Sequence, residues 1–151
     1  TLLPLFDQKL MIVSDEATAE AGKDWPKLVW VVDVQDETNP VPISTFPIPA
    51  VDEFKGRGGR YGAHNLHENR PVASNLVSEK IIFGTFFNGG VRAYDVSNPF
   101  RPEEVAYYVP EAPRGWRAGA VQIIDVLVDE RNVVYAVDRL IGGLYTRQLE
   151  V

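Results

Sequence analysis

The chain contains no cysteine, one methionine and two histidines among its 151 residues. The lack of cysteine excludes disulfide bonds and thiol chemistry. No apolar run approaches the roughly 18 residues that a membrane-spanning helix needs, so we expect no transmembrane segment. Basic residues are fewer than acidic ones, 15 against 21, and the formal net charge of −6 provides no overall attraction to nucleic acid. A hydrophobic content of 45% is that of an ordinary globular domain.

Two stretches of the sequence repeat one pattern. The tetrapeptide VVDV at 31–34 precedes Asn39-Pro40, and AYDV at 93–96 precedes Asn98-Pro99. Each copy predicts an apolar strand followed by a turn, because Asn before proline initiates turns and proline cannot donate to a strand ladder. We expect the carboxylates at the two strand ends, Asp33 and Asp95, to accept backbone N–H groups and fix these turns.

Two further patterns repeat as well. The motif R-G-x-R-x-G-A occurs at 57–63 and again at 114–120, and Gly-Gly steps at 89–90 and 142–143 separate apolar runs. Gly-Gly between apolar runs is typical of hairpin loops that need positive φ. Joined in chain order, the patterns predict a unit of four strands, which is the blade of a β-propeller and takes roughly 40–50 residues.

The predicted fold is therefore all-β, a β-propeller of four-stranded antiparallel blades. The chain provides about two and a half blades: a partial blade at 1–60, a complete blade at 61–110 and a partial blade at 111–151. In the first blade we expect strands two to four, at 10–13, 28–34 and 43–48. Because strands of this number do not close a ring, our hypothesis is that residues 1–151 are the C-terminal portion of a longer propeller domain. A missing N-terminal segment or a second chain would complete the ring.

The repeats, together with Gly62-Ala63-His64 and the GGLY tetrapeptide at 142–145, resemble those of the LVIVD-repeat proteins. The resemblance implies a β-propeller fold and an extracytoplasmic location, either periplasmic, secreted or at the cell surface. It implies no particular activity, since a propeller hosts many unrelated functions. One departure affects the site, because Val121 stands in the last blade where His64 stands in the middle one.

The densest polar cluster is HNLHEN at 64–69, where the innermost strand of the complete blade should begin, near the mouth of the central channel. His64 and His67 are candidate ligands of a divalent transition metal. His67 and Glu68 are candidate catalytic residues, with Glu68 as a general base. However, residues three apart point to opposite faces of a regular strand. The alternative is that both histidines bond to loop backbone.

The repeated R-G-x-R-x-G-A loops place arginines ahead of two adjacent inner strands. Guanidinium groups match carboxylates and phosphates, so a site for a small anionic ligand at one rim of the channel is a candidate. Its residues are Arg57, Arg60, Arg114, Arg117 and Trp116. The alternative is that each arginine pairs with an acidic residue or with loop carbonyls in the neighbouring blade.

Two functions follow from these candidates, and the sequence leaves open whether the protein is an enzyme. The first is an extracytoplasmic binding or scaffold protein whose ligand is a protein, a glycan or a small anion. The second is a metal-dependent enzyme that acts on a small anionic substrate at the channel mouth. For the fold, we expect Tyr94, Val96, Ile123 and Val134 to be buried, because such apolar runs indicate burial on both faces of a sheet.

Overall fold

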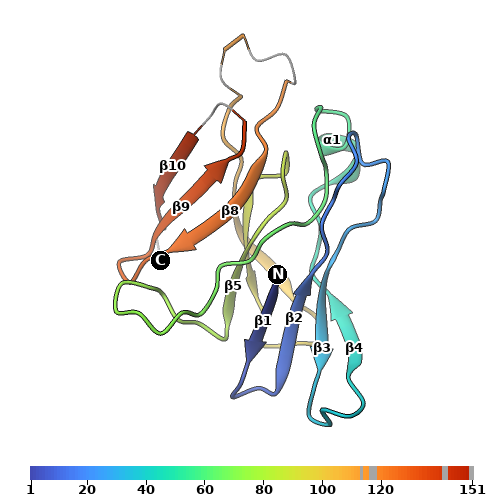
Figure 1. Ribbon diagram of the computed structural model, residues 1–151, viewed down its shortest axis with the longest axis vertical. Helices are drawn as coiled ribbons and strands as arrows, with labels where there is room; N and C mark the ends of the chain where they lie inside the picture. Colours follow the sequence, from blue (N-terminus) through green and yellow to red (C-terminus); the bar gives the residue numbers. More distant parts are fainter. Residues whose placement is uncertain (113, 116–118, 141–142, 150–151) are drawn as a thin grey trace.

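The chain folds into three antiparallel β-sheets with almost no helix (Figure 1). The computed structural model describes residues 1–112, 114–115, 119–140 and 143–149. Its only helix within these ranges is the single turn α1 (Val51–Phe54). No helix among the described residues is long and apolar enough to cross a membrane. The predicted all-β class is confirmed.

The first sheet has four strands in sequence order: β1 (Leu2–Leu5), β2 (Leu10–Ser14), β3 (Val29–Asp33) and β4 (Val41–Thr45). The sequence analysis expected only the last three of these. β1 carries Pro4, which weakens its strand signal, but β1 is an edge strand and an edge tolerates a missing N–H donor. Leu3 and Leu5 alternate inward and are almost fully buried, so this short strand completes the sheet.

The middle sheet contains β5 (Ile81–Thr85), β6 (Val91–Asp95) and β7 (Glu103–Tyr108). Residues 61–67, which we call the inner segment, run beside β5 in place of a regular fourth strand. Two isolated antiparallel bridges, Tyr61 with Phe87 and Leu66 with Gly84, hold the inner segment to the sheet. The backbone N–H groups of His64 and His67 also donate to carbonyl groups of β5.

The last sheet has the order β10-β9-β8, with β8 (Ile123–Val128), β9 (Val133–Asp138) and β10 (Gly143–Gln148). In Figure 1 the last sheet, orange to red, and the first sheet, blue to cyan, lie on either side of β5. The three sheets do not close into a barrel in the part of the chain that the structure describes.

The turns follow the repeats. The backbone N–H of Gln35 donates to Asp33 at 2.8 Å, and that of Ser97 donates to Asp95 at 2.7 Å, as the two Asn-Pro turns predict. Hydrogen bonds from Ser97 lower the pKa of Asp95, so its carboxylate is the stable form. In the hairpin between β5 and β6, Gly90 has φ of 77°, the positive value that the Gly-Gly step predicts.

The core consists of two clusters, one on each side of the middle sheet. One cluster packs the first sheet against the middle sheet and includes Phe46 and Tyr94, whose ring centroids are 4.6 Å apart. The other packs the middle sheet against the last and includes Val91 and Ile123. The predicted burial is confirmed at all four positions named from the sequence, Tyr94, Val96, Ile123 and Val134.

Candidate functional site

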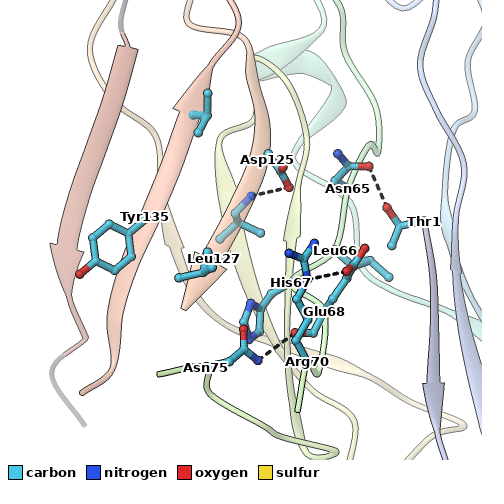
Figure 2. Close-up of a pocket in the computed structure, with 12 residues that line it drawn as sticks. Thr1, Asn65, Leu66, His67, Glu68, Arg70, Asn75, Asp125, Leu127 and Tyr135 are labelled. Atoms are coloured by element: carbon cyan, nitrogen blue, oxygen red, sulfur yellow. Dashed lines mark hydrogen bonds and ion pairs between the residues drawn. The ribbon is translucent and has the colours of Figure 1, made fainter. Parts of the chain in front are cut away.

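A polar hollow of about 210 Å³ lies between the inner segment and β8 (Figure 2). Its walls come from parts of the chain that are far apart in sequence: Thr1 beside β1, the run 65–70 with Asn75, and residues of β8 and β9. Thr1 Oγ1 donates to Asn65 Oδ1 at 2.7 Å, which joins the start of the first sheet to the inner segment. The hollow therefore lies where the start of the chain, the inner segment and β8 meet.

His67 borders this hollow, but backbone groups hold both of its ring nitrogens. Nδ1 accepts the N–H of Val128 at 3.2 Å, and Nε2 lies 2.8 Å from the carbonyl oxygen of Leu76, to which it donates. This pair of contacts assigns the neutral tautomer with the proton on Nε2. Burial lowers the pKa of His67 and favours the same neutral form. With both nitrogens engaged, His67 has no free lone pair for a metal ion.

His64 lies on the other side of the inner segment, as strand alternation predicts. Its Nδ1 is 2.6 Å from the carbonyl oxygen of Ile124, and its ring meets the edge of Phe87 at 4.8 Å between centroids. Its Nε2 lies 3.6 Å from the Glu16 carboxylate. No group of three or more His, Asp or Glu side chains that could hold a metal ion occurs among the described residues. The structure thus does not bring His64 and His67 together as a ligand set.

Glu68 forms a surface ion pair with Arg70, whose Nε lies 2.8 Å from Glu68 Oε2. Both side chains are about half exposed or more, at 49% and 62%. The backbone carbonyl of Glu68 accepts the Asn75 amide at 3.0 Å, which fixes the loop below the hollow. Glu68 is thus paired with the guanidinium of Arg70.

Asp125 is a further polar residue that lines the hollow. It lies in β8, at the register shift between Ile123 and Asp125 against β9. The irregularity leaves the Asp125 side chain exposed, and its Oδ1 accepts only the N–H of the adjacent Val126 at 3.0 Å. β-Bulges often redirect side chains beside functional sites. A polar residue inside an otherwise apolar strand was the signal available in the sequence.

Two of the four candidate arginines are engaged by their own surroundings. Arg57 NH2 is 2.5 Å from Glu53 Oε1, and its guanidinium lies 4.1 Å above the Phe54 ring. Arg60 NH1 lies 3.4 Å from the Glu16 carboxylate and donates to the carbonyl of Ala17. The partners are acidic residues and a loop carbonyl, as in the structural alternative, but they lie within residues 1–60 and not in a neighbouring predicted blade.

The second copy of the loop is described only in part. Arg114 is exposed in a turn, while Trp116 and Arg117 lie outside the described residues. The glycines explain why the motif repeats. Gly58 and Gly115, at equivalent places, have φ of 99° and 81°, and Gly62 and Gly119 have φ of 140° and 75°. The motif therefore specifies a backbone path before each inner strand.

One charged cluster was missed entirely from the sequence. Arg92 in β6 is only 4% exposed, and its NH1 lies 3.0 and 2.9 Å from the two carboxylate oxygens of Glu104 in β7. Its guanidinium also lies 5.1 Å from the Phe54 ring centroid and 4.7 Å from that of Tyr107. This pair, in which Arg92 is buried and Glu104 is partly exposed, ties α1 to the middle sheet and faces away from the polar hollow. Its residues share no wall with that site.

Comparison with known proteins adds no family to this description. No known family matches the chain, and no curated protein is similar to it in sequence. The resemblance to the LVIVD-repeat proteins therefore rests on the repeated residues themselves.

Proposed function

We propose that this chain is a β-propeller module of the LVIVD-repeat type that binds a hydroxyl-rich ligand, such as a glycan, in the polar hollow. The arrangement of the sheets supports the propeller. Three sheets pack side by side, and in each the chain runs from an inner element outward. An exported location belongs to the same proposal and is supported by the family resemblance.

The observation that carries the binding proposal is the convergence of three inner elements at one hollow. Asn65 and Glu68 come from the inner segment and its continuation, and Asp125 comes from β8. Carboxylates accept hydrogen bonds from hydroxyl groups, and the Asn65 amide can both accept and donate them. The hollow is lined by two carboxylates, those of Glu68 and Asp125, and by one guanidinium, that of Arg70. It therefore favours a neutral polyhydroxylated ligand over the anion expected from the arginine loops.

The size of the hollow limits what enters it. About 210 Å³ is smaller than the roughly 300–1,000 Å³ of typical small-molecule pockets. Leu127 and Val137 give the hollow an apolar wall on which one sugar ring can lie. We therefore propose that one sugar unit of a larger glycan occupies it. The enzyme alternative gains no support, because His67 is committed to backbone bonds and Glu68 to Arg70.

The test is titration of ¹⁵N-labelled protein with a panel of mono- and oligosaccharides, followed by amide chemical shifts. We expect shifts at Asn65, Glu68 and Asp125 with at least one sugar, and loss of these shifts in Asp125→Asn. That substitution keeps an oxygen acceptor for the Val126 N–H, so the local fold is retained. Glu130→Gln is the matched control, since Glu130 is an exposed acid in the turn after β8, outside the hollow. Shifts that Asp125→Asn leaves intact, or no shifts at all, would contradict the proposal.

A further inference from the structure

A groove of about 310 Å³ lies between the middle sheet and the last sheet, beside their outer strands β7 and β10. Its lining includes four side chains of the core cluster between these sheets, which are at most 6% exposed: Phe83, Val91, Ala93 and Val134. Ala106 of β7 pairs with Ala93 and is exposed in the same groove. The two alanines fill little of the space between the sheets, so an apolar gap remains there.

The charged side chains that line this groove are both basic, Arg92 and Arg147, and its described lining includes no acidic side chain. Glu104 already compensates the charge of Arg92 through the two contacts to its NH1. Arg147 forms no ion pair with any carboxylate in the part of the chain that the structure describes. The groove therefore carries one uncompensated positive charge.

The guanidinium of Arg147 is fixed in place, yet most of its donors are available. NH2 donates to Tyr108 Oη at 2.5 Å, and NH1 donates to the carbonyl oxygen of Thr146 at 2.8 Å. The guanidinium carbon lies 4.3 Å from the centroid of the Tyr108 ring. Because a guanidinium has five N–H donors, these two bonds leave others for a ligand. Carboxylates bind such donors in pairs.

The internal repeat shows that packing alone does not require an arginine here. Tyr94 and Arg147 correspond, since each lies four residues after the second glycine of its Gly-Gly step. Strand pairing likewise makes Phe46 correspond to Tyr108. Between the first and middle sheets these positions hold two buried rings 4.6 Å apart. Between the middle and last sheets they hold Tyr108 and an exposed arginine, which brings a charge to the groove.

We propose that this groove binds a small organic acid, with the apolar body of the acid against Ala93 and Ala106 and its carboxylate on Arg147. Apolar walls with a few polar groups are usual in small-molecule pockets, and the groove reaches their lower size limit of roughly 300 Å³. The uncompensated guanidinium selects an acid over a neutral apolar compound. The groove shares no lining residue with the polar hollow, so this site is independent of the proposed glycan binding.

Titration of ¹⁵N-labelled protein with 1-naphthoate tests the proposal, with 1-naphthalenemethanol as a neutral probe of similar shape. We expect saturable amide shifts at Ala93, Ala106 and Arg147, and an affinity for the alcohol that is weaker by about tenfold or more. Arg147→Met keeps an apolar stem without the charge, so it should bind both probes with similar affinity. Arg101→Met is the matched control, because it removes the same charge from an exposed residue outside the groove. It should keep the wild-type preference for 1-naphthoate.

Ala106→Phe tests the apolar part of the site. Ala106 is exposed in the edge strand β7, so the variant should fold, while its ring should fill the groove and abolish binding of both probes. Equal affinity of the wild-type chain for the two probes, or a preference for 1-naphthoate that survives in Arg147→Met, would overturn the proposal.

The pattern of shifts provides a further check. Shifts confined to residues outside the groove, or no shifts, would also overturn the proposal. The same holds if the groove amides shift with protein concentration alone, because a second copy would then occupy the groove. Shifts induced by sugars at Asn65, Glu68 and Asp125 report on the polar hollow separately, so failure at one site is distinguishable from failure at the other.

Discussion

Replacing Tyr94 by phenylalanine should stabilise this protein, although Tyr94 is one of its most buried residues. The side chain is 0% exposed, and its Oη has no hydrogen-bond partner among the described residues. Burial raises the pKa of Tyr94 well above its ordinary value, so the hydroxyl is a neutral, unpaired group. The ring packs on Phe46 and Phe86, with centroids 4.6 and 6.1 Å away, and phenylalanine retains both contacts.

The magnitude follows from what the substitution removes. A buried hydroxyl without a partner costs about 1–3 kcal/mol relative to its hydrated state. Loss of the oxygen leaves a small space whose packing cost offsets part of this gain. We therefore expect Tyr94→Phe to raise the free energy of unfolding by about 1 kcal/mol.

Tyr61→Phe is the matched comparison. Tyr61 is equally buried, but its hydroxyl donates to the carbonyl oxygen of Pro49. Removing this hydroxyl leaves the carbonyl unpaired, which should lower the free energy of unfolding by about 1–2 kcal/mol. The two variants lose the same atom from the same residue type, so their difference isolates the hydrogen bond.

Urea unfolding measured by tryptophan fluorescence and circular dichroism gives both values, provided that the m-value is unchanged. Trp25 stacks on Tyr61 at 5.5 Å between ring centroids and reports on that region directly. The expected order of stability is Tyr94→Phe, wild type, Tyr61→Phe. A loss of stability in Tyr94→Phe as large as in Tyr61→Phe would refute the reasoning, because it would show that the Tyr94 hydroxyl is hydrogen-bonded in solution.

Three other substitutions test separate parts of the fold. Gly89→Val should destabilise by about 1 kcal/mol or more in urea unfolding, because a Cβ there would lie 2.8 Å from Pro49 Cγ; no change would contradict the hairpin packing. Arg92→Met should cost about 1–3 kcal/mol by leaving the partly exposed Glu104 carboxylate unpaired, and Arg92→Met with Glu104→Leu should recover much of the loss; equal losses would argue against a stabilising pair. Because burial lowers the pKa of His67 in the folded state, the protein is more stable above the ordinary histidine pKa of about 6.5. This stability is lost as pH falls from that value through the lower folded-state pKa. His67→Gln should therefore flatten the stability profile just below pH 6.5, and an unchanged slope would contradict the assignment.

The parts of the fold that the sequence could predict are those set by short-range chemistry. Asp95 ends its strand and accepts the Ser97 N–H because the turn lies within two residues of it. Gly90 adopts positive φ because the hairpin is local. The all-β class followed from repeated signals of this kind.

The parts that it could not predict depend on partners far along the chain. Nothing near His67 indicates that its Nδ1 will accept the N–H of Val128, 61 residues away. A polar residue in an apolar strand marks Asp125 in the sequence, but the register shift that exposes it arises from pairing with β9. β1 was missed because Pro4 lowers strand propensity, whereas its pairing with β2 and the burial of Leu3 and Leu5 decide the outcome.

The arrangement of three packed sheets also explains where function can reside in this chain. Each face of the middle sheet is occupied by contact with a neighbour, so most of its strand residues are committed to packing. Arg92 shows how costly a charge there is, since it needs Glu104 and two aromatic rings around it. The polar groups that line the hollow lie where strands end or lose their regular form. Glu68 directly follows the inner segment, and Asp125 lies in the irregular part of β8. For this reason the two carboxylates border one hollow, while the faces of the sheets pack against one another.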